Sequence, residues 1–339
     1  MNAGAKQSFL VIQTAFIGDV ILATAVVEKL HLQFPEAKID FLLRKGNEQL
    51  LSGHPFLHRV LIWDKKRGKL TNLLALTRQV RATRYDAVIN VHRFASSGWI
   101  TARSGSPQRI GFDKNPFSFW FTHRVSHDIR PGVHEIDRNQ KLIGHLTGFK
   151  PATPRLYPTA PDRQSVTQWQ VGDEGKRRAY VCLAPTSVWF TKQWSRERWV
   201  ELIGKFPEHL VVYLLGAPAD RDACDWILRK SGSPRVRNLA GELTFLQSAA
   251  LMKEAVMNYV NDSAPMHLAS AVDAPVTAIY CSTLPSFGFG PLSSNSRVVE
   301  THEKLDCRPC GLHGHRQCPK GHFKCSSGIQ VDQLLETIN

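Results

Sequence analysis

The stretch from Val256 to Ala271, V-M-N-Y-V-N-D-S-A-P-M-H-L-A-S-A, constrains the fold more than any other part of this 339-residue chain. A short apolar run of strand type, 256–260, ends at Asn261-Asp262-Ser263. Pro265 then suits the first turn of a helix, and apolar residues continue at helical spacing. A helix that starts directly after a strand has unpaired N–H groups and a partial positive charge, which can bind a phosphate. Ser263 would cap this helix and donate its hydroxyl to the same anion; an ordinary strand–helix turn with a serine cap is the alternative.

The rest of the chain alternates strand-type and helical segments, which is typical of doubly wound parallel sheets. In the first half we expect strands at 9–12, 39–43, 60–62 and 87–89, and helices at 20–32 and 70–82. Prolines cluster between residues 150 and 162, so we expect domains at 1–155 and 156–339. In the second half we expect strands at 179–184, 210–215, 256–260 and 276–280, and helices at about 195–206 and 331–338. The prediction is an α/β protein whose two sheets bind ligands at the carboxyl ends of their strands.

Composition narrows the class of protein. A hydrophobic content of 42% is typical of a globular chain, and no apolar run reaches the roughly 18 residues of a membrane span. No secretory signal precedes the first strand, so we expect a cytosolic protein. Neither a G-x-G-x-x-G fingerprint nor a P-loop is present, which argues against a dehydrogenase or a kinase. The formal net charge of +14 favours an anionic partner, with solubility alone as the alternative.

Polar residues at the expected strand ends of the first half indicate a second ligand-binding edge. Asp19 follows Gly18 after the first strand, where a helix-capping role is the alternative. Arg44 follows the second strand, and Arg93 follows the fourth. Arginines at strand ends suit an anionic ligand; the alternative is that they are ordinary solvated surface residues.

Two of these segments resemble glycosyltransferase family 9, the ADP-heptose:lipopolysaccharide heptosyltransferases. N-D-S-A-P-M-H-L-A-S-A resembles the donor-site signature D-[ST]-G-x-x-H, with Ala264 where glycine is usual. L-V-I-Q-T-A-F-I-G-D-V-I-L-A-T resembles the opening of family members, whose Gly-Asp pair supplies the catalytic base. The resemblance implies the GT-B fold, with two facing doubly wound Rossmann-like domains, the acceptor on the N-terminal one and the donor on the C-terminal one. It also implies inverting transfer of heptose from ADP-heptose to the inner core of lipopolysaccharide, with Asp19 as the base.

The resemblance also implies a set of binding residues. T-K-Q-W-S-R-E-R-W resembles the segment around a donor-phosphate lysine, and H-E-I-D-R at 134–138 resembles a segment beside the acceptor. The spacing of the latter puts His134 and Arg138 on one helix face. The expected donor-binding residues are Thr186, Ser187, Lys192, Asp220, Leu243, Asp262, Ser263 and His267. The expected acceptor-binding residues are Arg44, Arg93, His134 and Arg138.

Four of the seven cysteines crowd into residues 307–325, here called the Cys-rich segment. Their spacing is C-x2-C-x7-C-x6-C, formed by Cys307, Cys310, Cys318 and Cys325. In a cytosolic chain such crowding indicates a closed structural site for Zn²⁺ or iron, with four reduced thiols as the alternative. The remaining cysteines are expected to be buried. We expect no obligatory cofactor for catalysis.

Two other functions compete with the heptosyltransferase prediction. One is the same fold with another nucleotide sugar as donor. The other is a basic nucleic-acid-binding protein with a Cys metal cluster, although the basic residues are dispersed and no nucleic-acid-binding motif is present. On the leading prediction the partners are ADP-heptose, an anionic lipopolysaccharide acceptor and the inner membrane surface, with no nucleic acid. The protein would then be cytoplasmic and peripheral on the inner membrane.

Overall fold

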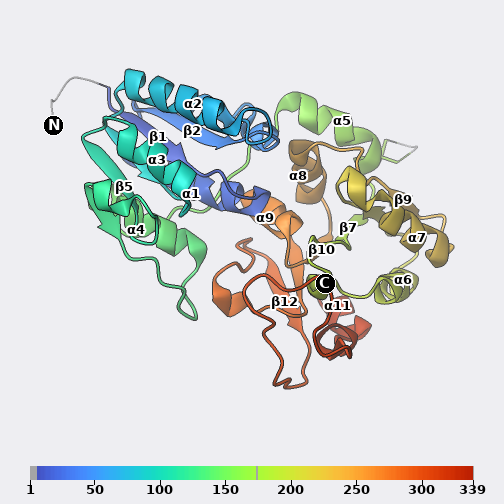
Figure 1. The fold of residues 1–339 in the computed structure, drawn as a ribbon. Coiled ribbons are helices and arrows are strands. Elements are labelled where there is room, and N and C mark those ends of the chain that lie inside the picture. The colour runs from blue at the N-terminus through green and yellow to red at the C-terminus, as the bar shows by residue number, and fades with distance from the viewer. Residues whose placement is uncertain (1–5, 173–174, 339) are drawn as a thin grey trace. The chain divides into compact units, whose positions relative to one another are not determined.

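The protein has two parallel six-stranded sheets, each in its own compact unit (Figure 1). The structure, a computed structural model, describes residues 6–172 and 175–338. The first unit is Met1–Tyr157 and the second is Pro158–Asn339. In strand order the sheets are β3-β2-β1-β4-β5-β6 and β12-β11-β10-β7-β8-β9. Both orders are the Rossmann order, so the α/β prediction with two doubly wound sheets is confirmed.

The elements of the first unit follow the expected alternation. They are β1 (Ser8–Ile12), α1 (Ile17–Gln33), β2 (Lys38–Arg44), η1 (Glu48–Leu51), β3 (Leu57–Trp63), α2 (Lys69–Thr83), β4 (Ala87–Asn90), α3 (Ala95–Arg103), β5 (Gln108–Phe112), η2 (Ser118–Trp120), β6 (His123–Val125) and α4 (Glu135–Thr147). α1 packs against α4, and α2 packs against α3. Right-handed crossovers put α1 and α3 on opposite faces of the sheet.

The second unit repeats this arrangement and adds a tail. Its elements are α5 (Ala160–Gln170), β7 (Tyr180–Ala184), η3 (Phe190–Lys192), α6 (Arg196–Lys205), β8 (Val211–Leu214), η4 (Pro218–Asp220), α7 (Arg221–Ser231), β9 (Val236–Asn238), α8 (Phe245–Lys253), β10 (Met257–Asn261), α9 (Ala264–Ala271), β11 (Val276–Tyr280), η5 (Pro285–Phe287), β12 (Ser296–Glu300), α10 (Lys324–Ser327) and α11 (Val331–Leu335). The Cys-rich segment lies between β12 and α11.

The central strands are buried on both faces, which explains why most of their residues are apolar. β1 and β4 are neighbours, and so are β7 and β10. At each of these pairs the strand order reverses, and the loops that leave the two strands diverge. Ligands of doubly wound folds bind at such switch points. In the first unit, the loops that leave the two strands are the turn before α1 and residues 91–94. In the second unit, they are residues 185–192 and 262–263.

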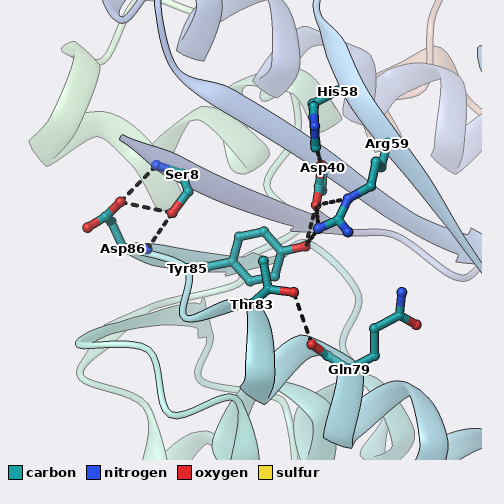
Figure 2. Close-up of polar contacts among 8 residues, drawn as sticks. All are labelled: Ser8, Asp40, His58, Arg59, Gln79, Thr83, Tyr85 and Asp86. Atoms are coloured by element: carbon teal, nitrogen blue, oxygen red, sulfur yellow. Dashed lines mark hydrogen bonds and ion pairs between the residues drawn. The ribbon is translucent and has the colours of Figure 1, made fainter. Parts of the chain in front are cut away.

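A polar network with a structural role lies at the amino ends of the strands of the first sheet, away from the switch point (Figure 2). Asp40 on β2 accepts hydrogen bonds from Arg59 on β3, at 3.1 Å from Nε and 2.7 Å from Nη2, and also from Tyr85. Burial raises the pKa of Asp40, but these bonds and one with His58 outweigh it, so the net shift is downward. The network ties strands together early in their course, away from the loops at the switch point.

Several predicted bounds need correction. α1 begins at Ile17 rather than at residue 20, so Asp19 lies within the first helical turn. α11 ends at Leu335 rather than at 338. Short terminal turns are the least determined by periodicity, because few residues contribute to the pattern. Among the helices of the described part of the chain, none combines the length and apolarity that crossing a membrane requires.

Candidate active site

Asp19 is held in the first turn of α1, at the switch point of the first sheet. Its Oδ2 accepts a hydrogen bond from the main-chain N–H of Phe16, 3.1 Å away. This contact is the helix-capping role that the sequence analysis gave as the alternative for Asp19. The side chain is half-buried. The negative charge of Asp19 contributes to a raised pKa at Glu135, so the two carboxyl groups lie within electrostatic reach of each other.

Glu135, at the start of α4, forms a buried ion pair with Arg138. Arg138 Nε lies 2.7 Å from Glu135 Oε2, and Arg138 Nη1 donates to the carbonyl of Val133 at 2.6 Å. The Arg138 side chain, expected from the sequence to bind the acceptor, is 1% exposed. Burial raises the pKa of Glu135, against the opposing charge of Arg138. Glu135 was missed as a candidate, although it stands inside the H-E-I-D-R segment.

His134 also lies differently from the prediction. It is the N-cap of α4, and its Nδ1 accepts a hydrogen bond from the N–H of Ile136 at 3.2 Å. His134 therefore precedes the helix instead of sharing a helix face with Arg138. The reason is that the extended backbone of the N-cap residue lets a side-chain acceptor reach the first free N–H groups.

Cations surround the Asp19 turn. Arg93 is exposed after β4, and its positive charge lies close enough to lower the pKa values of two histidines. Burial, Lys65 and Arg93 lower the pKa of His92 to about 3. Burial, Arg93 and Arg138 lower the pKa of His127 to about 4. Both histidines are therefore neutral near pH 7, and the positive charge here comes from the arginines and Lys65.

A second group of cations lies beside the same turn. Lys65 Nζ donates to the carbonyl of Thr14 at 2.8 Å and lies 4.6 Å from the ring centroid of Trp63. Burial, Arg44 and Lys69 lower its pKa to about 8. The Arg44 guanidinium lies over the ring of Phe16, 4.8 Å from its centroid. The turn that carries Asp19 thus has positive charge at two neighbouring strand ends, which suits an anionic ligand.

In the second unit, Lys192 and Asp262 meet at the switch point. Lys192 Nζ lies 2.6 Å from Asp262 Oδ2, and both side chains are largely buried. Thr283 Oγ1 donates to the same oxygen at 2.6 Å. Asn261 Oδ1 accepts from the N–H of Trp194 at 3.0 Å, which ties the loop after β7 to the end of β10. The structure therefore brings together two of the residues expected at the donor site, and it adds Thr283.

Ser263 takes the N-cap position of α9, but its hydroxyl does not cap the helix. Ser263 Oγ instead donates to the carbonyl of Asn261 at 3.4 Å. The prediction of a serine cap is therefore wrong for the side chain, because the hydroxyl donates to this carbonyl and makes no bond to the first helical N–H groups. His267 is buried within α9.

The other expected donor residues lie at neighbouring strand ends. Thr186 and Ser187 are half-buried after β7, and their carbonyls accept from Asn261 Nδ2 at 3.5 Å and from Gln193 Nε2 at 2.7 Å. Asp220 follows β8, and its Oδ2 accepts from the N–H of Ala217 at 2.8 Å within its own turn. Leu243 is half-buried just before α8.

The four clustered cysteines line one cavity of about 420 Å³, together with His315 and His322. Cys307 Sγ lies 3.7 Å from His322 Nε2. Burial and the other three thiols raise the pKa of Cys325 to about 11. Within residues 6–172 and 175–338, no three His, Cys, Asp or Glu side chains form a ready metal-ligand set. The thiols share a cavity, but the closed four-sulfur site expected from their spacing is not formed. Cys182, Cys224 and Cys281 are buried, as predicted.

Comparisons with known proteins place the chain in a family. The model of glycosyltransferase family 9 (heptosyltransferase) matches residues 73–320. Lipopolysaccharide heptosyltransferase 3 of Escherichia coli K12 is 30% identical over 286 residues, which is 78% of this chain and 80% of that protein. Lipopolysaccharide heptosyltransferase 2 of the same strain is 24% identical over 97% of both chains.

Solved structures share the fold. The family 9 glycosyl transferase of Veillonella parvula has a TM-score of 0.84 at 21% identity, over 98% of this chain and 95% of that one. E. coli ADP-heptose LPS heptosyltransferase II has a TM-score of 0.79 at 22% identity, over 98% of both chains. E. coli WaaC with ADP-2-deoxy-2-fluoro heptose scores 0.70 at 19% identity, over 98% of this chain and 99% of that one. The iron-containing glycosyltransferase TibC of E. coli scores 0.58 at 18% identity, over 98% of this chain and 75% of that one.

These matches decide between the two classes of protein weighed from the sequence, in favour of an enzyme and against a nucleic-acid-binding protein. The fold is GT-B, as expected. The chain belongs to glycosyltransferase family 9, the heptosyltransferases of lipopolysaccharide core biosynthesis.

Proposed function

We propose that the enzyme transfers heptose from ADP-heptose to an inner-core lipopolysaccharide acceptor and inverts the anomeric configuration. The observation that carries this proposal is the pair of switch points: one has a carboxylate among cations, and the other has a lysine paired with Asp262 beside a helix N-terminus. The first suits deprotonation of a hydroxyl on an anionic acceptor, and the second suits a diphosphate. The relative that binds an ADP-heptose analogue supports the identity of the donor.

In the proposed mechanism the N-terminal domain binds the acceptor, and Asp19 is the general base. A sugar hydroxyl is a poor nucleophile, so a carboxylate that takes its proton during bond formation lowers the barrier. Attack on the anomeric carbon in line with the departing diphosphate inverts that centre in one displacement. Arg93 and Arg44 would hold acidic groups of the acceptor. His134 and Arg138 would act on the acceptor side indirectly, since one caps α4 and the other is paired with Glu135.

The leaving group is ADP, which gains negative charge on its β-phosphate as the bond breaks. That charge would be stabilised by Lys192, by the N-terminus of α9 and by nearby hydroxyls. Asp262 keeps the ammonium of Lys192 in place through its 2.6 Å ion pair. The hydroxyls in question are those of Thr186, Ser187 and Ser263. On the rest of the donor, Asp220 would accept from the ribose and Leu243 would border the adenine, while His267 belongs to the family's donor signature.

We further propose that the Cys-rich segment takes up one structural Zn²⁺ or iron ion, which would draw its thiols together around the cavity that they line and would not contact the reacting groups. Soft thiolates with a nearby imidazole are the donor set that these metals prefer, and Cys307, Cys310, Cys318 and Cys325 line a single cavity. An iron-containing relative shares the fold. Elemental analysis of protein purified without a metal column should give about one metal per chain. Metal-free protein of equal stability, with four titratable thiols in this segment, would contradict the proposal.

We propose that the enzyme works in the cytoplasm at the inner membrane surface, because its acceptor is a glycolipid. Phe119 and Trp120 of η2 are exposed, and their rings pack together with centroids 4.3 Å apart. Between residues 99 and 124 there are four Lys or Arg side chains and one carboxylate. Exposed aromatic rings amid positive charge fit the interface of an anionic bilayer.

The test of the proposed function is transfer in vitro. Purified protein is incubated with ADP-heptose and defined truncated core acceptors, and the products are read by mass spectrometry. We expect one added heptose, unchanged by EDTA, because protein donors replace the metal at the diphosphate. ADP-glucose and UDP-glucose serve as rival donors. Transfer only from a rival donor would favour the same fold with another nucleotide sugar.

A further inference from the structure

The Cys-rich segment lies directly against the turn that carries Lys192. The main-chain N–H of Thr191 donates to the carbonyl of His315 at 3.1 Å, and the N–H of His315 donates to Thr191 Oγ1 at 2.7 Å. Thr191 is 1% exposed. These two residues are 124 positions apart in the chain. The reciprocal bonds fix the main chain of η3 immediately before Lys192.

Gly314 makes the close approach possible. Its φ of +77° is in the left-handed region, and a Cβ there would lie 2.9 Å from Thr191 Oγ1 and 3.3 Å from Lys192 Cγ. Two other glycines of the same segment provide an internal comparison. Gly311 and Gly321 have φ of +70° and +72°, yet a Cβ on either would meet nothing within 4 Å. The three positions therefore share the same backbone strain on substitution, and only Gly314 borders the lysine.

Further contacts tie the segment to both sides of the donor edge. Cys310 N–H donates to the carbonyl of Ser282 at 2.8 Å, and Ser282 Oγ donates to Thr191 Oγ1 at 3.1 Å. Ser282 precedes Thr283, whose hydroxyl binds the Asp262 carboxylate that pairs with Lys192. The segment thus contacts η3 from one side and the loop after β11 from the other.

We propose that the Cys-rich segment is a clamp that positions Lys192 for the donor diphosphate, with Gly314 and Thr191 as its positioning residues. This inference rests on the proposed donor role of Lys192. Neither positioning residue needs to touch the donor. Thr191 holds the turn from which the lysine extends, and the missing side chain of Gly314 leaves room for the lysine stem. The function of the segment is then to preorganise the donor site, so that ADP does not have to order a mobile lysine when it binds.

The experiment compares three glycine variants and two threonine variants in the full-length protein. Gly314→Ala should raise the Kd for ADP, measured by calorimetry, about fivefold or more over Gly311→Ala and Gly321→Ala, the scale of one lost hydrogen bond. Thr191→Val should weaken ADP binding similarly, whereas Thr191→Ser, which keeps the hydroxyl, should restore it. In the transfer assay the KM for ADP-heptose should rise and the KM for the acceptor should stay the same. A merely structural role would not separate the two substrates.

A Lys192→Ala arm separates failure of this inference from failure of the proposed function. If Lys192→Ala weakens ADP binding while Gly314→Ala matches the other two glycine variants, the clamp is overturned and the donor role of Lys192 stands. If Lys192→Ala leaves ADP affinity unchanged, the donor role and the clamp both fall. If Gly314→Ala lowers the melting temperature more than its controls do, the comparison of Thr191→Val with Thr191→Ser becomes the test. Equal ADP affinity of these two variants overturns the clamp.

Discussion

At the scale of single residues, Arg93 and Arg138 show how alike two arginines can look in sequence and how differently they lie. Both belong to the first unit, and both were expected at the acceptor. Arg93 is exposed, while Arg138 is buried in its pair with Glu135. Removing one partner of a buried pair leaves an uncompensated charge, which typically costs about 3–5 kcal/mol. A variant at Arg138 would therefore test folding, so Arg93 is the better test of acceptor binding.

Arg93→Ala should raise the KM for the acceptor roughly five- to tenfold and leave the KM for ADP-heptose unchanged, because one charge-assisted hydrogen bond is lost on the acceptor side only. Steady-state kinetics with each substrate varied in turn measures both constants. Arg78→Ala, an exposed arginine on α2, is the matched control and should change neither. An equal rise in both constants would count against acceptor contact.

Asp19→Asn should lower kcat by roughly 10²–10⁴-fold, the usual contribution of a general base, because the amide cannot accept the proton. Binding of ADP should persist, since Asp19 belongs to the first unit. Single-turnover transfer and calorimetry with ADP give the two values. Asp128→Asn, which removes a surface carboxylate paired with Arg130, is the control. Near-normal turnover in Asp19→Asn would remove Asp19 from the role.

At the scale of elements, η2 is too short to bury its own side chains, and this leaves its aromatic residues on the surface. Trp99 of α3 packs edge-on against Phe117, which stacks on Trp120. Arg109 on β5 bonds to the same turn: its Nε donates to the carbonyl of Trp120 at 2.9 Å. These contacts hold the turn against α3 and β5, while Phe119 and Trp120 remain exposed. Exposed aromatic side chains are suited to insertion at a membrane interface.

Phe119→Ser combined with Trp120→Ser should weaken binding to vesicles that contain phosphatidylglycerol by roughly tenfold or more, because two apolar side chains no longer leave water. Co-sedimentation at low and moderate salt measures the effect. Phe149→Ser is the control: Phe149 is also exposed, but it follows the end of α4, which packs with α1 on the face of the sheet opposite α3, whereas η2 contacts α3. Undiminished binding of the double variant would exclude η2 as the membrane contact.

At the scale of the whole molecule, burial of neutral histidines links stability to pH. His92 and His127 have folded-state pKa values lowered to about 3 and about 4, mainly by burial. The unfolded chain binds these protons at about pH 6.5, so below that pH it holds more protons than the folded protein. The free energy of unfolding should therefore be greatest above pH 6.5 and fall as the pH drops toward 4.

Denaturant unfolding at pH 7 and pH 5 should show this fall, by roughly 1–2 kcal/mol for each histidine. His127→Gln should reduce the difference between the two pH values, because one of the two protonation sites is gone. His209→Gln, at an exposed position, should leave the difference as it is. Stability that is unchanged or rises between pH 7 and pH 5 would contradict the account.

The sequence by itself determined the alternation of strands and helices, the two sheets and the polar turns that follow their central strands. These features are local: apolar periodicity sets the element type, and a strand, a tight turn and a helix such as 256–271 follow from neighbouring residues. Asp19 and Asp262 could be named because each stands at such a turn, whereas Lys192 was named from the resemblance of its segment to a family. The resemblance to a family then supplied roles that periodicity does not contain.

Only the tertiary structure decided which charges are buried and which distant segments meet. Nothing in the spacing of H-E-I-D-R shows that Arg138 lies inside the protein, since burial depends on what packs over a helix. The contact of His315 with Thr191 joins residues far apart in the chain, and local patterns carry no information about such pairs. Gly314 reads as an ordinary loop glycine, like Gly311 and Gly321. Its distinction is the space that the neighbouring lysine occupies, which exists only once the chain has folded.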